Sequence, residues 1–508
     1  MRNRFISIIL ILFLLALSGF NCSQSPVGEQ SITILHTNDI HGSFLPVKAT
    51  WTRKKPEPLI GGFLALKSHV ENFRKSENNT LLLDAGDIMT GNLICNMEYE
   101  GVKGGALVHF MNEIGYEGMT IGNHEFDLGA ANVRGLMGLA KFPVYSANLY
   151  TNQDHLFTDA GYHIYKKNGL RIGVIGIITE HLFDVLNADK RKGLDVRENA
   201  PIVEKIASEI DDKTDLIVVL SHCGVDEDKK LAEQLSRKVD VIVGGHSHTR
   251  LKEPLKVNGI LIVQAGAKAT NLGHLQLTVA GDTVKSYAGE LVDLWADSIT
   301  QYPEMAKEIT KYQTAIDAQF GKVIGELKTE WKRAHSQESN IGDFLADCIR
   351  DYTGCEIGTV NSGGIRKDMD PGEITIRDIM EILPFENYVV KFNATGADIQ
   401  KFVETNARKS AFNSGGILQI SGISYRYKKS GDNLKVPGIT INGKPLDPNK
   451  TYSVASMDFV AIANGEKYFG FKPENVIETG SLFTDVVIEI VKKIKIIEAP
   501  IAGRIKEL

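Results

Sequence analysis

The sequence predicts an α/β protein of two domains joined by a helix. Between Ser31 and Val292, short β-branched apolar runs alternate with stretches of helical periodicity, which is the pattern of buried strands in an α/β domain. A helical pattern occupies residues 301–325, and residues 326–508 contain a further set of helices and strands. The 508 residues are enough for two to four domains at roughly 150 residues each.

The composition is that of a globular protein with sizeable cores. Hydrophobic residues make up 43% of the chain and charged residues 24%, which excludes wholesale disorder, collagen and coiled coil. The net charge of −6 argues against a protein dedicated to binding nucleic acid polymers. Five cysteines exclude a disulfide scaffold. Cys348 and Cys355 could pair in an oxidising compartment or remain free thiols.

Residues 1–22 have the pattern of a signal peptide. Arg2 and Arg4 precede residues 5–17, which are apolar apart from one serine and form a run too short to span a bilayer with ease. Cys22 follows, as in a bacterial lipoprotein in which this cysteine carries the lipid. We expect lipidation at Cys22 or ordinary cleavage nearby, and both predict an exported protein of the periplasm or cell envelope. No other segment is apolar enough to predict a transmembrane span.

The apolar runs of the first domain are expected to be strands, in the order in which they occur. Helical stretches at 64–73 and 202–210 lie between some of them. In such sheets the residues that follow the strands gather at one edge and carry function. The runs cover residues 32–35, 81–83, 119–121, 172–178, 216–220, 241–243 and 260–263.

Asp, His or Asn follows five of these runs, in each case beside glycine. One such cluster is typical of a turn, but five in one domain indicate a shared metal centre whose loops approach closely at the glycines. Mixed oxygen and nitrogen ligands favour Mn, Zn, Fe or Co, and their number implies two ions, which together suit hydrolysis of phosphate esters. The clusters lie at residues 36–42, 84–87, 122–127, 221–224 and 244–248.

The order of these motifs resembles the calcineurin-like metallophosphatases. Thr37–Gly42 and Gly122–Gly129 are similar to motifs of the two-domain 5′-nucleotidase / UDP-sugar hydrolase family in particular. This resemblance implies a four-layer α/β/β/α sandwich over residues 28–300 and two divalent metal ions. It also implies a linking helix at 301–325 and a separate α+β (α/β) substrate-binding domain over 326–508.

The resemblance also implies roles for individual residues. Asp87 would bridge both ions. His124 would face the substrate, stabilising phosphoryl oxygens or protonating the leaving group, and Asp127 would orient it. The family usually has Gln or Asn where this chain has His248. The other ligands would be Asp39, His41 and His248 for the first ion, and Asn123, His222 and His246 for the second.

The second domain contains fewer direct signals. The polar turn Asn361–Arg366 indicates phosphate or carboxylate recognition, or a surface turn. Residues 384–387 and 464–469 each place an aromatic side chain that could lie in the core or stack on a nucleobase. The resemblance implies that Arg366 contacts the substrate and that Phe385 and Phe469 stack on the base. The candidate substrate-binding set is Asn361, Arg366, Phe385, Asn387, Phe469 and Arg333.

Two departures from the family pattern leave the substrate open. His335 stands where the family often has a substrate-binding Arg, and Arg333 could replace it. The segment 465–469 lacks the Asp expected near the ribose hydroxyls. The first prediction is hydrolysis of nucleoside 5′-monophosphates. The alternatives are 2′,3′-cyclic nucleotides, UDP-sugars, nucleoside polyphosphates or NAD, or a surface protein that binds nucleotides or metal without turnover. A hinge is expected near the start of the helix 303–320 or in the loop after it.

Overall fold

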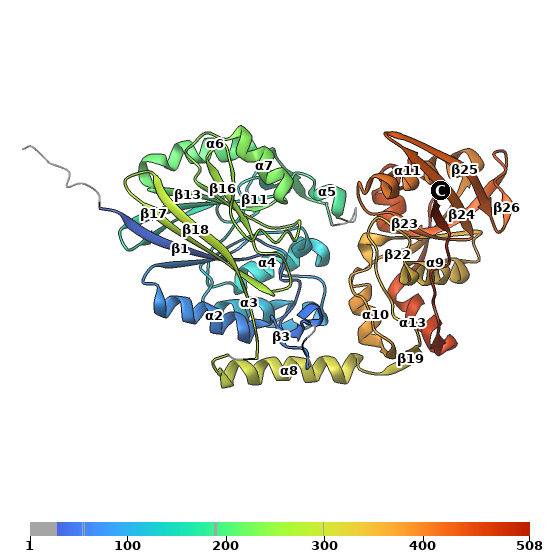
Figure 1. Cartoon of the computed structure of the whole chain (residues 1–508), viewed down its shortest axis with the longest axis horizontal. Coiled ribbons are helices and arrows are strands. Elements are labelled where there is room, and N and C mark those ends of the chain that lie inside the picture. Colours follow the sequence, from blue (N-terminus) through green and yellow to red (C-terminus); the bar gives the residue numbers. More distant parts are fainter. Residues whose placement is uncertain (1–27, 53, 55, 187–189, 298) are drawn as a thin grey trace, which may run out of the picture.

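The computed structural model describes residues 28–508 except 53, 55, 187–189 and 298, so the predicted signal peptide and Cys22 lie outside the described residues. Two domains lie side by side along the long axis (Figure 1). They are connected by helix α8 (Pro303–Phe320), which occupies the predicted linking segment. The predicted fold class is confirmed.

Two six-stranded sheets form the centre of the N-terminal domain. The first has the order β18 (Val284–Asp293), β17 (Asn271–Val279), β1 (Gln30–Thr37), β4 (Thr80–Asp84), β7 (Gly118–Thr120) and β8 (Val144–Tyr145). The second has the order β10 (Tyr162–Lys167), β11 (Leu170–Ile178), β13 (Leu216–His222), β14 (Val241–Gly244), β16 (Ile260–Gln264) and β15 (Leu255–Val257). β1, β4, β7 and β8 run parallel, as do β11, β13, β14 and β16, so their carboxyl ends share one edge of each sheet.

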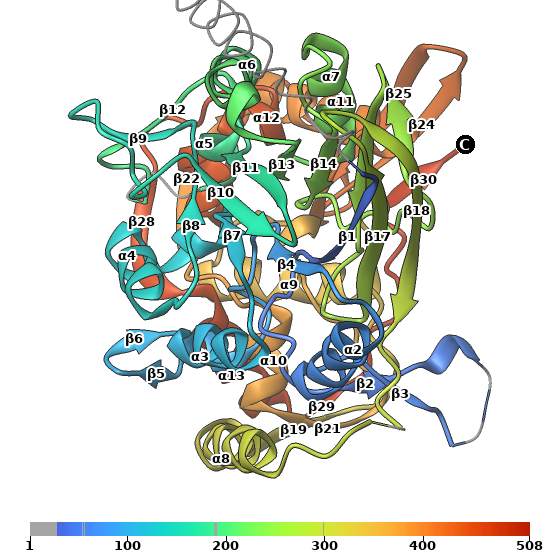
Figure 2. The ribbon, with the colours of Figure 1, turned by 90° about the vertical axis from the view of Figure 1, so that its left-hand side faces the viewer.

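The two sheets pack face to face between two layers of helices (Figure 2). Ile34 and Leu83 of the first sheet share one buried cluster with Val218 and Val243 of the second. Helices α2 (Phe63–Ser76), α3 (Gly105–Ile114) and α4 (Ala130–Leu139) accompany the first sheet, and α5 (Leu182–Val185), α6 (Asn199–Ile210) and α7 (Val225–Gln234) the second. This arrangement is the expected four-layer sandwich. Short strand pairs are β2 (Val47–Lys48) with β3 (Leu59–Ile60), β5 (Glu98–Tyr99) with β6 (Val102–Lys103), and β9 (Leu149–Thr151) with β12 (Leu194–Val196).

The C-terminal domain contains three sheets around one core. A five-stranded sheet has the order β23 (Leu418–Ser421), β20 (Ile357–Asn361), β27 (Thr451–Met457), β22 (Tyr388–Thr395) and β28 (Ile477–Leu482). A four-stranded sheet has the order β26 (Lys444–Pro445), β25 (Asn433–Ile441), β24 (Ile423–Ser430) and β30 (Ile505–Glu507). The third sheet is β21 (Gly372–Thr375), β19 (Val323–Leu327) and β29 (Ile496–Ile497). The helices are α9 (Asn340–Thr353), α10 (Ile376–Ile382), α11 (Gly396–Phe412), α12 (Gly465–Phe469) and α13 (Phe483–Ile494).

Helix α8 belongs to the N-terminal domain by its packing. Met305, Ile309 and Ile316 repeat at helical spacing and are buried in the same cluster as α2 and α3. Met380 on α10 packs against the cores of both domains. The two domains are therefore in contact in this conformation.

Two further expectations concern cysteines and membranes. Cys348 and Cys355 are both buried free thiols, so the pairing considered from the sequence is absent in the described structure. Among the described residues, no helix combines the length and the apolar character needed to cross a membrane.

Candidate active site between the domains

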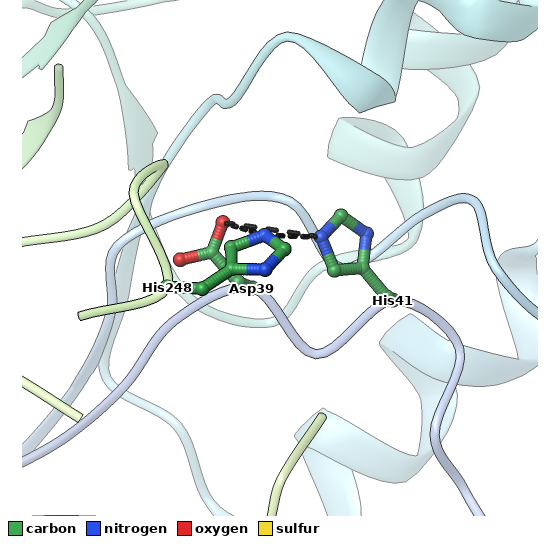
Figure 3. A group of neighbouring side chains, drawn as sticks. All are labelled: Asp39, His41 and His248. Atoms are coloured by element: carbon green, nitrogen blue, oxygen red, sulfur yellow. Dashed lines mark hydrogen bonds and ion pairs between the residues drawn. The ribbon is translucent and has the colours of Figure 1, made fainter. Parts of the chain in front are cut away.

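The first group of candidate metal ligands gathers at the carboxyl ends of β1 and β14. One ligand atom from each of Asp39, His41 and His248 lies within 4.8 Å of the others (Figure 3). Nε2 of His248 lies 3.0 Å from Nε2 of His41 and 3.4 Å from Oδ1 of Asp39. Nδ1 of His41 lies 3.0 Å from the carbonyl oxygens of Met89 and Thr90 and donates there, which leaves the Nε2 lone pair for a cation.

The second group lies at the ends of β4, β13 and β14. One ligand atom from each of Asp87, His222 and His246 lies within 4.8 Å of the others. Nε2 of His222 is 3.1 Å from Oδ2 of Asp87, and Nδ1 of His246 is 2.8 Å from Oδ1 of Asn123. Nδ1 of His222 donates to the carbonyl oxygen of Ala85 at 2.6 Å, so its Nε2 is the atom that would face a cation. The structure thus brings together all seven predicted ligands, in two groups.

The charges of both groups suit divalent cations. Burial lowers the pKa of His41 to about 3 and that of His246 to about 4, so both imidazoles are neutral ligands at pH 7. Burial also lowers the pKa of His222, but the carboxylates of Asp87 and Asp39 outweigh it and raise that pKa to about 10. Without a cation, His222 therefore keeps a proton between Nε2 and the Asp87 carboxylate, in the place that a cation would take. Lone pairs that face one another at these distances repel unless a proton or a cation lies between them.

The loops that carry the candidate ligands have an uncommon backbone conformation. Asp39, His41, Asp87, His246 and His248 all have φ between 50° and 73°, in the left-handed region that costs non-glycine residues energy. Such a conformation turns the chain sharply after each strand. It aims the side chains back toward one point.

Neighbouring glycines allow the loops to approach, as the sequence indicated. A Cβ on Gly122 would lie 2.2 Å from Oδ1 of Asp87, and a Cβ on Gly245 would lie 2.7 Å from the carbonyl oxygen of Ala85. Any side chain at these positions would separate the loops that carry the ligands.

Glu125 is a functional residue that the sequence analysis did not single out. Its buried carboxylate accepts the backbone N–H groups of Asp87 at 3.1 Å, Ile88 at 2.8 Å, Met89 at 3.2 Å and Gly122 at 2.6 Å. It thereby fixes the loop of one ligand to the loop of another. Its place between His124 and Asp127, inside the most distinctive motif, was the signal that could have identified it.

Asn38 has a similar positioning role for the first group. Its amide donates to Oδ2 of Asp39 and to the carbonyl oxygen of Gly266, both at 2.6 Å, and its oxygen accepts the N–H of Ala265 at 2.8 Å. The side chain therefore ties β1 to the loop after β16 and holds the Asp39 carboxylate in place.

His124 and Asp127 form a hydrogen-bonded pair beside the second group. Nδ1 of His124 lies 2.7 Å from Oδ2 of Asp127, which also accepts the hydroxyl of Thr90 at 2.5 Å. The backbone N–H of His124 donates to Oδ1 of Asp87 at 2.8 Å. Burial lowers the pKa of His124, but the carboxylates of Asp127 and Asp87 outweigh it and raise that pKa. The imidazolium is thus favoured next to the candidate ligands.

A cavity of about 500 Å³ joins these groups to the C-terminal domain. The ring of His124 lies 5.6 Å from that of Phe385, nearly parallel to it, and Arg366 lies 5.8 Å over the same ring. Residues that line the cavity from the N-terminal domain include Asp87, Asn123, His124, Asp127, His246 and His248, and those from the C-terminal domain include His335, Asn361, Arg366, Phe385, Asn387, Phe459 and Tyr468.

Arg366 is a partly buried cation of the C-terminal domain that faces the candidate metal ligands. Burial lowers its pKa, while the carboxylates of Asp87, Asp127 and Asp39 raise it. It remains charged at pH 7 because arginine keeps its proton in proteins. A guanidinium here would face an anionic group bound in the cavity from the C-terminal side.

Arg333 and His335 occupy different environments. The guanidinium of Arg333 donates to Asp368 and to the carbonyl oxygen of Arg366, both at 3.0 Å, and does not line the cavity. His335 does line it. His335, which stands where the family often has an arginine, therefore contacts the cavity.

Phe469 lies away from the cavity. It is 1% exposed, and its ring centroid lies 5.3 Å from those of Phe392 and Phe402 in the core of the domain. The stacking role expected for Phe469 is therefore not supported by its position. Its neighbour Tyr468 lines the cavity instead, together with Phe459.

Two family models match the chain in tandem. The calcineurin-like phosphoesterase model matches residues 32–250, and the model of the 5′-nucleotidase C-terminal domain matches residues 323–472. The chain belongs to the two-domain 5′-nucleotidase family. The resemblance inferred from the motifs is therefore confirmed.

Curated relatives in this 5′-nucleotidase family span nearly the whole chain. An apyrase of Tabanus yao is 28% identical, with 89% of each chain covered. The protein UshA of Yersinia enterocolitica is 28% identical, with 86% of each chain covered. A human 5′-nucleotidase is 27% identical over 94% of this chain and 91% of its own length.

The chain is also similar in structure to a solved 5′-nucleotidase. The 5′-nucleotidase precursor of Thermus thermophilus is 29% identical, with a TM-score of 0.83 over 94% of this chain and 99% of its own. The sulfate thiohydrolase SoxB of the same species has a TM-score of 0.77 at 18% identity, with 94% and 96% covered, and shows the fold alone.

Proposed function

We propose that the protein is an exported, metal-dependent phosphohydrolase that releases phosphate from nucleotides, with nucleoside 5′-monophosphates as the preferred substrates. The observation that carries this proposal is the cavity between the domains. It is lined by a histidine–carboxylate pair, candidate metal ligands from both groups, a partly buried arginine and an aromatic ring. Export rests on the pattern of residues 1–22, and lipidation at Cys22 is one form of it.

Two divalent ions, of Mn, Zn, Co or Fe, would be held by the two groups. Asp39, His41 and His248 would bind the first, and Asn123, His222 and His246 the second. Asp87 would contact both, since it acts electrostatically on His41 as well as on His222. When bound, the ions activate water and offset the negative charge of the phosphoryl group.

The remaining residues bind and orient the substrate. Arg366 would hold phosphoryl oxygens through its fork of N–H groups. Protonated His124 would stabilise the charge that develops on the phosphoryl oxygens or give its proton to the leaving alkoxide. Asp127, itself held by Thr90, keeps the His124 ring in place and favours its charged form.

The aromatic residues would select the base. Phe385 and Tyr468, with Phe459, form the apolar side of the cavity against which a nucleobase can stack. Asn361 also lines the cavity, and its buried Oδ1 has no hydrogen-bond partner among the described residues, so a base or ribose donor would satisfy it. UDP-sugars, nucleoside polyphosphates, NAD and 2′,3′-cyclic nucleotides remain the alternative substrates.

Phosphate release from AMP, UDP-glucose, ATP and 2′,3′-cyclic AMP tests this proposal. Protein lacking residues 1–22 should turn over AMP fastest with Mn²⁺ or Co²⁺, and EDTA should abolish the activity. His124→Ala should lower kcat by about 100-fold or more, because a positioned general acid contributes that much. His155→Ala, which removes an exposed histidine, is the matched control and should leave kcat unchanged.

Other results would change the conclusion. A faster rate on 2′,3′-cyclic AMP or UDP-glucose would keep the mechanism and replace the substrate. Bound metal without turnover of any substrate would contradict an enzyme and favour a surface nucleotide- or metal-binding protein.

A further inference from the structure

The outer sheet of the C-terminal domain has a charge opposite to that of the whole protein. Its strands β24, β25 and β26 lie at the end of the domain away from the N-terminal domain (Figure 1). Residues 423–446 and strand β30 of the same sheet together contain six basic residues and two acids, Asp432 and Glu507, in a chain whose net charge is −6. No step of the proposed hydrolysis uses this sheet.

Strand alternation places the basic residues on one face. Along β24, Ile423, Tyr425 and Tyr427 are buried against the core, whereas Arg426 and Lys428 are exposed. Successive side chains of a strand point to opposite faces, so the two cations share the outer face.

The register joins cations from three strands. Lys428 lies directly opposite Lys435 of β25, and Arg426 lies directly opposite Lys506 of β30. We call these four residues the basic face. Within the part of the chain that the structure describes, none of the four has an ion pair with an acid, although Arg504 nearby pairs with Asp347.

This pairing is unfavourable for the isolated protein. Like charges directly opposite each other destabilise a sheet. Two such pairs lie side by side, and none of their cations forms an ion pair among the described residues, so bound anions would lower the repulsion.

We propose that the basic face docks the protein on an anionic phospholipid surface. A group of cations that share one face of a sheet and stand on long apolar stems matches a plane of phosphate headgroups. Single-stranded nucleic acid is a poorer match because Tyr425 and Tyr427 are buried and cannot stack on bases. Docking at this outer end leaves the cavity between the domains accessible to nucleotides.

Co-sedimentation with vesicles tests the docking surface. Protein lacking residues 1–22, which cannot be lipidated at Cys22, should bind vesicles of equal parts phosphatidylglycerol and phosphatidylcholine and not phosphatidylcholine alone. Lys428→Gln/Lys435→Gln should weaken that binding by about 25-fold, since each cation near an anionic surface contributes about fivefold. Added salt should also weaken the binding of the wild-type protein to these vesicles, because it screens exposed charges.

A matched double variant separates the basic face from total charge. Lys252→Gln/Lys285→Gln removes two exposed lysines of the N-terminal domain and should bind like the wild type. Unchanged AMP hydrolysis in both variants shows that they fold. Equal weakening by the two double variants, or no binding of the wild type to anionic vesicles, would overturn the proposal. Preferred binding of a single-stranded oligonucleotide would overturn it in favour of nucleic acid.

Discussion

Glu125 determines the position of a metal ligand without being one. Both oxygens of its carboxylate are used by backbone N–H groups of the loops that carry Asp87 and Asn123. In Glu125→Gln one of these oxygens becomes an NH₂ group that faces other donors. We expect a loss of about 1–3 kcal/mol in the free energy of unfolding. The Mn²⁺ concentration for half-maximal activity should also rise.

Thermal unfolding and metal titration of activity check this expectation. Glu253→Gln, at an exposed position, is the control. If Glu125→Gln kept the wild-type metal dependence, the carboxylate would not position the Asp87 loop.

Asp240 makes stability depend on pH at the end of the second sheet remote from the metal ligands. Its carboxylate accepts the N–H of Ile217 at 2.9 Å. Burial raises its pKa, the Ile217 N–H lowers it, and Asp282 and Asp211 raise it again, to about 7 overall from an ordinary value of 3.8. The folded pKa exceeds the unfolded one, so this stability is fully present below the unfolded value and is lost as the pH rises toward about 7.

Asp240→Asn keeps the acceptor and removes the charge. In EDTA, its gain in unfolding free energy over the wild type should be about 2 kcal/mol larger near pH 8 than near pH 5. Denaturant unfolding at both pH values measures this difference. Asp159→Asn, an exposed control, should show no such change, and a gain independent of pH in Asp240→Asn would refute the assignment.

At the scale of elements, the turn after β7 depends on close contact with the loop after β4. Gly122→Ala would place a Cβ 2.2 Å from Oδ1 of Asp87 and force the loops apart. Metal-dependent turnover should fall by about 100-fold or more, as expected when reacting groups are displaced. Gly138→Ala in helix α4 meets nothing within 4 Å and should keep full activity. Steady-state kinetics distinguish the two, and an active Gly122→Ala would show that the contact can relax.

The strands and the polar clusters that follow them could be predicted because their signals are local, whereas the four layers and the assignment of ligands to two ions came from the family resemblance. Each ligand follows a short apolar run, and parallel strands bring such ends together without further information. Which aromatic residue of 465–469 faces the cavity could not be predicted in this way. Adjacent residues on a short helix point about 100° apart, so Tyr468 reaches the cavity while Phe469 enters the core.

The choice between Arg333 and His335 depended on a distant partner. Asp368 binds the Arg333 guanidinium, and nothing in the sequence around residue 333 indicates that contact. Glu125 was missed for the opposite reason. It lies within a recognised motif, yet its function is to bind backbone groups of residues 87–89, which have no sequence signal of their own.

At the level of the protein as a whole, the cavity has walls from both domains, so separation of the domains would widen it for substrate entry and product release. We expect this motion to pivot near the start of α8 or in the loop after it. Lys268 of the N-terminal domain and Asp368 of the C-terminal domain are close enough for their charges to interact. Burial lowers the pKa of Lys268, and the carboxylate of Asp368 acts in the opposite direction. A cleavable bis-maleimide between Lys268→Cys and Asp368→Cys should therefore abolish turnover, and cleavage of the linker should restore it.

Each single cysteine variant treated with the same reagent is the control and should remain active. Phosphate release before and after cleavage measures the effect. Undiminished turnover by the cross-linked protein would show that catalysis proceeds without domain separation.

The left-handed backbone conformation of the five ligand residues affects which substitutions the protein can accept during evolution. Glycine at any of these positions would relieve about 1–2 kcal/mol of conformational strain and remove a ligand at the same time. Bound ions compensate for that strain, because a ligand of the native state alone stabilises it by mass action. In these loops, selection for heat resistance and selection for turnover act in opposite directions wherever metal is scarce.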